Sequence, residues 1–203
     1  MSKHFIFAKE TNNPQEYYWF KTGLSQEEVD RIIKLASEIK EERASTIGSE
    51  DGATTRSSMV KWIPQTKDWD WLYQKMMDQA REANSELWHF DLYSSIENIQ
   101  YTEYYASENG HYDWHQDIGP GELPSRRKIS ITIQLSTSEE YEGGELLICK
   151  GSNGNGVLDA NVQCPRGKGV SVLFPSYMMH RVTPVTRGTR RSLVLWVGGA
   201  HYR

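Results

Sequence analysis

The chain has 203 residues, of which 37% are apolar and 25% charged, and its formal net charge is −4. This size and composition favour one globular domain over residues 1–203 and exclude a disordered chain. The acidic balance argues against general nucleic-acid binding, and no apolar run reaches membrane length. Because residues 1–10 carry no signal-peptide pattern, we expect a cytoplasmic protein in which Cys149 and Cys164 are free thiols rather than a disulfide.

The first part of the chain, to about residue 90, predicts a helical support region that follows an opening strand around Tyr17–Phe20. Ser25 and Glu28 are spaced as a capping box, in which each side chain accepts a hydrogen bond from the other residue's amide. Apolar residues then recur at helical spacing in two segments. The first segment contains Val29, Ile32, Ile33, Ala36 and Ile39, and the second contains Trp69, Leu72, Tyr73, Met76, Ala80, Ala83 and Leu87. Between the two helices we expect a polar loop over Ala44–Thr55 and a strand over Arg56–Ile63.

From Trp88 onward, short β-branched and aromatic segments alternate with turn residues. The expected strands are Ile96–Tyr105, His111–Asp117, Lys128–Ser136, Glu145–Cys149, Val157–Cys164, Val170–Phe174, His180–Val185 and Arg190–Val197. The Gly-rich segment 151–156 lacks the lysine of a phosphate-binding loop and predicts a hairpin loop. The pattern predicts an α+β, mainly β protein: a double-stranded β-helix (jelly roll, cupin-like) over about residues 91–203, with the two helices against its major sheet.

Two strands indicate which side faces the helices. In Lys128–Ser136, isoleucines and Leu135 alternate with Ser130, Thr132 and Gln134, so the polar set is expected to face the lumen of the barrel. In Arg190–Val197, the same alternation places Arg190 and Trp196 inside. A buried arginine is costly unless an anion meets it. Arg190 is therefore a candidate for binding a dicarboxylate, unless the register slips and leaves it on the surface.

A metal site is predicted from His115, Asp117 and His180. Residues two apart lie on the same face of a strand, so His115 and Asp117 can act together. A second imidazole from His180 completes two histidines and one carboxylate, which with open positions opposite is the arrangement of non-haem Fe(II) oxygenases. The plain alternatives are a polar strand pair and a turn histidine. A helical zinc pair of His111 and His115 is disfavoured, because no glutamate follows His111.

The segment from Tyr105 to Trp196 resembles the prolyl-4-hydroxylase branch of the 2-oxoglutarate/Fe(II)-dependent dioxygenases. The residues that carry the resemblance are Tyr105, Gly110 and Tyr112, His115 and Asp117, Arg127, Glu142–Leu146, Pro175 ahead of His180, Gly188–Arg190, and Trp196.

This resemblance implies a role for each matching residue. His115, Asp117 and His180 would hold Fe(II), and Arg190 would pair with the distal carboxylate of 2-oxoglutarate. Two further residues, Tyr105 and Gln134, would line the cosubstrate pocket, although Gln134 stands where relatives often carry a tyrosine and Leu146 replaces a threonine found in some of them. The mouth of the substrate site would be lined by Tyr112, Arg127 and Trp196.

The reaction implied by the resemblance is hydroxylation of an unactivated C–H bond, with 2-oxoglutarate and O2 consumed, succinate and CO2 formed, and ascorbate as an optional cofactor. A proline-containing peptide or protein is the leading substrate, and another protein residue or a small molecule is the alternative. A nucleic-acid demethylase is disfavoured, because Trp196 stands where those proteins usually carry a second arginine. A non-catalytic, cupin-like metal-binding module is disfavoured by Arg190 and the open metal site.

Overall fold

A computed structural model describes residues 17–44, 55–95, 97–150 and 161–201, which form antiparallel strands and two α-helices. The helices are α1 (Gln26–Ala36) and α2 (Asp70–Ala83), with a π-helical turn η1 (Asn84–Trp88) and two 3-10 turns, η2 (Ala106–Glu108) and η3 (Pro124–Arg126). The strands are β1 (Tyr18–Phe20), β2 (Glu42–Arg43), β3 (Arg56–Ser57), β4 (Met59–Ile63), β5 (Leu92–Ser95), β6 (Ile99–Tyr105), β7 (His111–His115), β8 (Arg127–Gln134), β9 (Tyr141–Gly143), β10 (Leu146–Cys149), β11 (Asn161–Gln163), β12 (Ser171–Pro175), β13 (His180–Val182) and β14 (Val185–Gly199).

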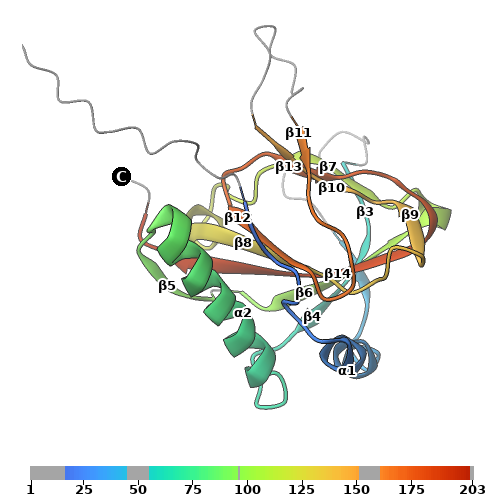
Figure 1. Cartoon of the computed structure of the whole chain (residues 1–203), viewed down its shortest axis with the longest axis horizontal. Coiled ribbons are helices and arrows are strands. Elements are labelled where there is room, and N and C mark those ends of the chain that lie inside the picture. Colours follow the sequence, from blue (N-terminus) through green and yellow to red (C-terminus); the bar gives the residue numbers. More distant parts are fainter. Residues whose placement is uncertain (1–16, 45–54, 96, 151–160, 202–203) are drawn as a thin grey trace, which may run out of the picture.

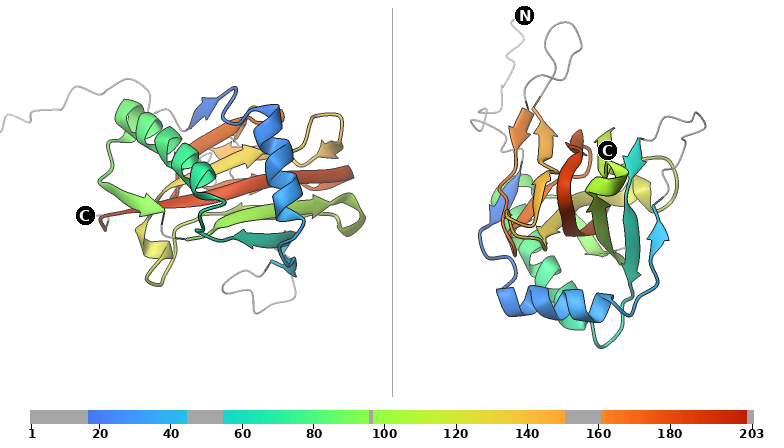
Figure 2. Two further views of the ribbon diagram at one scale, coloured as in Figure 1. Left: turned by 90° about the horizontal axis from the view of Figure 1, so that it is seen from below. Right: turned by 90° about the vertical axis from the view of Figure 1, so that its right-hand side faces the viewer.

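The strands form two antiparallel sheets. The nine-stranded sheet runs in the order β1-β12-β8-β14-β6-β4-β2, and β5 and β9 also pair with β14. The five-stranded sheet runs in the order β11-β10-β13-β7-β3. Both helices lie on the outer side of the larger sheet, and the smaller sheet lies on its other side (Figure 1). Figure 2 shows α1 and α2 crossing the face of the larger sheet.

The main hydrophobic core lies between the helices and the larger sheet. The apolar residues of β8 and β14 that alternate along each strand are all buried in this core with residues of α1 and α2: Ile129, Ile131, Ile133, Leu193, Leu195 and Val197. The expected orientation of both strands is thus confirmed. The opposite faces of β8 and β14 point toward the smaller sheet, and the space between the sheets is where a ligand site can form.

The two helices begin and end for identifiable reasons. The capping box is present, since Ser25 Oγ accepts a hydrogen bond from the Glu28 amide at 3.2 Å and Glu28 Oε2 accepts one from the Ser25 amide at 2.7 Å. The first helix ends at Ala36, one turn before the expected Ile39. The second helix passes into η1 and stops at His89, whose φ of 55° is left-handed. Both amide atoms of Asn84 bind the backbone of Phe90, which closes this end.

The strand expected over Arg56–Ile63 is two strands, because the chain crosses from one sheet to the other at Ser58. The first, β3, pairs with β7 in the smaller sheet, with Arg56 opposite Tyr112. The second, β4, pairs with β6 in the larger sheet. Residues around this crossing therefore contribute to both walls of the space between the sheets, which a single regular strand could not do.

Several other expectations can be compared with the described residues. Cys149 and Cys164 are free and buried, as expected. Neither α-helix in the described ranges is long and apolar enough to cross a bilayer. The predicted loop over Ala44–Thr55, the hairpin at 151–156 and the start of the Val157–Cys164 strand lie largely outside the described residues. Strand β14 is longer than expected because it pairs with β5, β6, β8 and β9 along its length.

Candidate functional site

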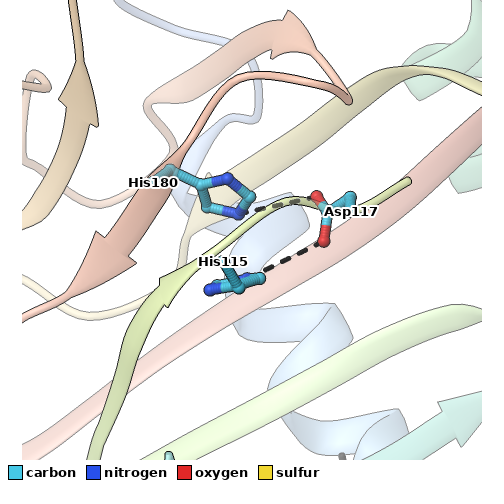
Figure 3. Close-up of side chains that lie close together, drawn as sticks. All are labelled: His115, Asp117 and His180. Atoms are coloured by element: carbon cyan, nitrogen blue, oxygen red, sulfur yellow. Dashed lines mark ion pairs between the residues drawn. The ribbon is translucent and has the colours of Figure 1, made fainter. Parts of the chain in front are cut away.

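The three predicted metal ligands meet between the two sheets (Figure 3). His115 ends β7 and His180 begins β13, and the two residues are register partners in adjacent strands. His115 Nε2 lies 3.8 Å from Asp117 Oδ1, and His180 Nε2 lies 3.6 Å from Asp117 Oδ2. One ligand atom from each of the three residues lies within 4.8 Å of the other two. Three donor atoms this close together can share one metal ion.

Asp117 reaches this position from a bend and not from a strand, because β7 ends at His115. The Asp117 amide donates to the carbonyl oxygen of Ser176 at 2.9 Å, which turns the chain toward the histidines. The Ser130 hydroxyl donates to Asp117 Oδ2 at 2.6 Å and also lies 2.9 Å from Ser176 Oγ. The expectation of one extended strand over His111–Asp117 is therefore corrected: two serines and a turn orient the carboxylate.

The two imidazoles are oriented by backbone carbonyl groups. Nδ1 of His115 lies 2.7 Å from the carbonyl oxygen of Asp113, and Nδ1 of His180 lies 2.9 Å from that of Met178. A carbonyl oxygen only accepts, so each Nδ1 donates to it and Nε2 is the nitrogen left to bind a metal. Burial, reinforced by the neighbouring His180, lowers the pKa of His115 to about 3. His115 is therefore a neutral ligand at physiological pH.

Asp117 remains ionised although it is buried. Burial alone would raise the pKa of its carboxyl group, but His180, His115 and the Ser130 hydrogen bond outweigh burial and lower the pKa below its usual value. Two imidazoles and one carboxylate form a donor set that fits Fe(II) and leaves coordination positions for other ligands.

A β-bulge places Tyr112 against His115. Between the paired residues His115–His180 and Tyr112–Val182, β7 has one more residue than β13. The extra residue brings Tyr112 to the same side as His115. Their rings stack, with centroids 3.4 Å apart and planes at 14°. Regular strand alternation would have put them on opposite faces.

A cavity of about 730 Å³ surrounds the metal-ligand residues, a size typical of small-molecule sites. Both sheets contribute to its wall. Of the nine residues to which the sequence analysis gave a role at the site, seven line the cavity: His115, Asp117, His180, Arg190, Arg127, Tyr112 and Trp196.

Arg190 is a buried cation on the wall of this cavity. Its side chain is 1% exposed, and its guanidinium group lies 5.3 Å from the centre of the Tyr104 ring. Nη1 donates to Ser192 Oγ at 3.1 Å, but Nε has no hydrogen-bond partner. No carboxylate in the described part of the chain forms an ion pair with Arg190. A buried guanidinium in this state can bind an anion from the cavity.

Residues 99–198 match the family model described as the 2OG-Fe(II) oxygenase superfamily. The matched residues run from the start of β6 into β14 and make up just under half of the chain. A PKHD-type hydroxylase of Alteromonas mediterranea is 35% identical over 96 residues, which cover 45% of this chain and 39% of that protein. A PKHD-type hydroxylase of Xylella fastidiosa is 38% identical over 99 residues, covering 44% of this chain and 40% of that protein. The chain therefore spans about two fifths of the length of these curated relatives.

Solved structures of prolyl hydroxylases have the same fold. A Pseudomonas putida prolyl-4-hydroxylase superposes with a TM-score of 0.64 and 21% identity, covering 91% of this chain and 93% of that one. A Trichoplax adhaerens prolyl hydroxylase in complex with a hypoxia inducible factor peptide fragment gives a TM-score of 0.70 and 17% identity, covering 91% of this chain and 84% of that one. The likeness confirms the expected double-stranded β-helix with two helices on its major sheet.

Two of the residues expected at the cosubstrate, Tyr105 and Gln134, do not line the cavity. Tyr105 lies on the face of β6 opposite Tyr104, and its hydroxyl donates to Glu41 Oε1 at 3.3 Å. Tyr104, the preceding residue of β6, lines the cavity beside Arg190 instead, and a cosubstrate contact for Tyr105 stays a prediction. Gln134 has the expected orientation on β8 but is 2% exposed, opposite Ser192 and away from the cavity wall. Strand alternation specifies a face, but not how far along the strand a cavity extends.

Arg127 is engaged by protein groups around Asp117. Its Nε donates to Glu97 Oε2 at 2.6 Å, and Nη2 forms an ion pair with the same carboxylate. Its Nη1 donates to the backbone carbonyl oxygen of Asp117 at 2.9 Å. The guanidinium also lies 3.8 Å from the centre of the Trp196 ring, and Trp196 is buried. Arg127 thus stabilises the bend that contains Asp117. A substrate contact for Arg127 or Trp196 stays a prediction.

The sequence reasoning did not assign four residues that the structure places at the site: Tyr104, Ser130, Glu97 and Arg56. Ser130 was expected to face the lumen, but nothing in its spacing linked it to Asp117. Glu97 precedes β6, and only its ion pair with Arg127, seen in the structure, indicates that it belongs to the site. The adjacent tyrosines at 104 and 105 were the available signal for Tyr104, and a choice between them needed the register of β6.

We expect Glu97→Gln and Arg127→Met each to weaken metal binding by roughly tenfold. Loss of an outer-shell partner typically lowers metal affinity by about 10- to 100-fold, and this is the lower end of that range. Without the ion pair, the carbonyl oxygen of Asp117 loses its fixed donor and the bend loosens. The affinity for Mn(II), measured from the electron paramagnetic resonance signal of the free ion, checks this. Arg126→Met is the matched control and should bind Mn(II) as wild type does. An unchanged affinity for Mn(II) in both test variants would show that Arg127 does not support the metal site and would leave substrate contact as its predicted role.

Proposed function

We propose that this chain is an Fe(II)- and 2-oxoglutarate-dependent dioxygenase that hydroxylates an unactivated C–H bond, with a prolyl residue of a peptide as the leading substrate. The observation that carries the proposal is the pairing, in one cavity, of an open His115–Asp117–His180 site with the buried, unpaired Arg190. The first fits Fe(II), and the second fits the distal carboxylate of a chelating dicarboxylate. When bound, Fe(II) and 2-oxoglutarate supply the activation of O2 that oxidises the C–H bond and releases succinate and CO2.

The residues of the chain bind and orient these groups. His115 and His180 would hold the metal through Nε2, with each Nδ1 proton on a backbone carbonyl. Ser130 keeps the Asp117 carboxylate directed at the metal position. Arg190 would bind the distal carboxylate of 2-oxoglutarate and so orient the cosubstrate in the cavity.

A proline-containing peptide is supported by the structurally similar prolyl hydroxylases, one of which is in complex with a peptide fragment. The test measures succinate release with Fe(II), 2-oxoglutarate and a panel of proline peptides, with and without ascorbate. We expect peptide-dependent succinate and a hydroxylated product with a mass increase of one oxygen. Activity on other residues or small molecules alone would remove proline from the proposal and keep the reaction class.

The non-catalytic alternative makes a different prediction about cosubstrate binding. A metal-binding module that keeps the triad for structure alone has no need to bind 2-oxoglutarate. Isothermal titration of 2-oxoglutarate into the Mn(II)-loaded protein separates the two. Metal-dependent binding supports the oxygenase, and an absence of binding contradicts it.

A further inference from the structure

A second arginine of the cavity, Arg56, lies outside residues 99–198, on strand β3 of the smaller sheet, next to the strand that carries His115. It is opposite Tyr112 in the pairing of β3 with β7, and its guanidinium group lies 4.6 Å from the centre of the Tyr112 ring. Tyr112 in turn stacks on His115. A single aromatic ring therefore separates the Arg56 guanidinium from a residue of the predicted metal site.

Among the described residues, the hydrogen-bonding capacity of the Arg56 guanidinium is not fully used. Its Nε donates to Ser58 Oγ at 2.8 Å, which fixes the plane of the group. Its Nη2 is buried and has no hydrogen-bond partner. Within the described ranges no carboxylate forms an ion pair with Arg56.

The other arginines on the cavity wall are accounted for. Arg43 forms an ion pair with Glu108 at 3.0 Å, and Arg127 pairs with Glu97. Arg190 is the proposed partner of 2-oxoglutarate. Arg56 is thus a second unpaired cation, on the sheet that faces Arg190 across the cavity.

The geometry favours a carboxylate as the missing partner. A guanidinium group stacked on an aromatic ring presents its N–H groups in a fixed plane and matches the two oxygens of a carboxylate. One unpaired arginine balances the single negative charge of a carboxylate, whereas a phosphate dianion would leave uncompensated charge here. Leaving a buried donor unpaired costs free energy, and an anionic oxygen from a ligand offsets this cost.

We infer that Arg56 binds a carboxylate of the substrate, close to the C–H bond that is oxidised. This inference rests on the proposed function and adds a substrate class to it. The carboxylate can come from the main-chain terminus of a free or C-terminal amino acid, or from an aspartate or glutamate side chain beside the reacting residue. In both cases an acidic substrate is selected over its uncharged amide analogue.

The experiment titrates matched probes into the protein loaded with Mn(II) and 2-oxoglutarate, a form that does not turn over. N-acetylproline and N-acetylprolinamide test a terminal carboxylate. The capped peptides Gly-Glu-Pro-Gly and Gly-Gln-Pro-Gly test a side-chain carboxylate. In at least one pair, we expect the acidic member to bind about tenfold more tightly, as is typical of a charge-assisted hydrogen bond. The pair that shows the difference identifies the source of the carboxylate.

Arg56→Met should abolish this preference while 2-oxoglutarate still binds with wild-type affinity, which also shows that the variant is folded. Arg56→Lys, which keeps the charge without the planar fork, should retain only part of the preference and serves as the second variant. The matched control is Arg43→Met, an exposed arginine on the same cavity wall, and it should retain the full preference.

The possible failures are distinguishable. If 2-oxoglutarate does not bind the wild-type Mn(II) protein, the proposed function fails and the inference fails with it. If 2-oxoglutarate binds but acidic and amide probes bind equally or not at all, only the inference is overturned. A preference that survives in Arg56→Met also overturns it, because the carboxylate is then held elsewhere.

Discussion

Asp117→Ala is expected to lower the affinity for Mn(II) by more than about a hundredfold, because losing an outer-shell partner alone costs roughly 10- to 100-fold. Asp117 supplies the only carboxylate of the three-residue cluster that could hold a metal among the described residues. Two neutral imidazoles would remain, without a negative charge to balance the ion. Titration of Mn(II), followed by the resonance signal of the free ion, measures the loss directly and requires no substrate.

The same variant should remain folded, with a free energy of unfolding within about 1 kcal/mol of the wild-type value in the absence of metal. The helix-facing core does not include Asp117, and removing a buried carboxylate also removes its desolvation cost. Asp113→Ala is the control, because the Asp113 side chain is exposed four residues before Asp117 and the variant keeps the backbone carbonyl beside His115. It should bind metal normally. Wild-type Mn(II) affinity in Asp117→Ala would refute the assigned ligand set.

Arg190→Met is expected to weaken the binding of 2-oxoglutarate to the Mn(II) protein by about a hundredfold or more. Truncating one partner of a buried, hydrogen-bonded charge pair costs about 2–5 kcal/mol, which corresponds to this range. Arg190→Lys should fall between methionine and wild type, because lysine keeps the charge but not the bidentate geometry. Isothermal titration calorimetry provides the affinities.

Without 2-oxoglutarate, Arg190→Met should unfold at a denaturant concentration equal to or higher than wild type. Among the described residues no carboxylate forms an ion pair with the buried wild-type guanidinium, so its removal relieves the cost of burying that charge. Arg187→Met is the control, since Arg187 is exposed and paired with Glu142 at 2.8 Å. Undiminished 2-oxoglutarate binding in Arg190→Met would assign the cosubstrate to another cation of the cavity, with Arg56 the first to examine.

Much of the scaffold was predictable because it depends on local rules. The Ser25–Glu28 capping box satisfies amides at the start of a helix wherever it occurs, and the helix begins there. The alternation in β8 and β14 separates a helix-facing side from a lumen-facing side, because successive strand residues point in opposite directions. These rules placed Ile131 and Leu195 in the core and Arg190 on the cavity side.

The same rules could not locate residues where the backbone departs from regularity. A bulge in β7 puts Tyr112 on the same side as His115, and a crossing at Ser58 sends Arg56 to the smaller sheet. The register of β6 decides between Tyr104 and Tyr105. A shift of one residue reverses every side chain of a strand, so a position assigned from spacing alone can be wrong by one.

By itself the sequence determined which residues could bind the metal and the cosubstrate. They are two histidines and an aspartate of the types that bind Fe(II), and an arginine at an inward-facing strand position. Only the tertiary structure decided how they are held. The Asp117 carboxylate is directed by Ser130 and by the Ser176 carbonyl, and its backbone by Arg127, contacts between residues distant in the chain. Pairing of β13 with β7 brings His180 opposite His115, because hydrogen bonding between sheet neighbours is independent of their separation in sequence.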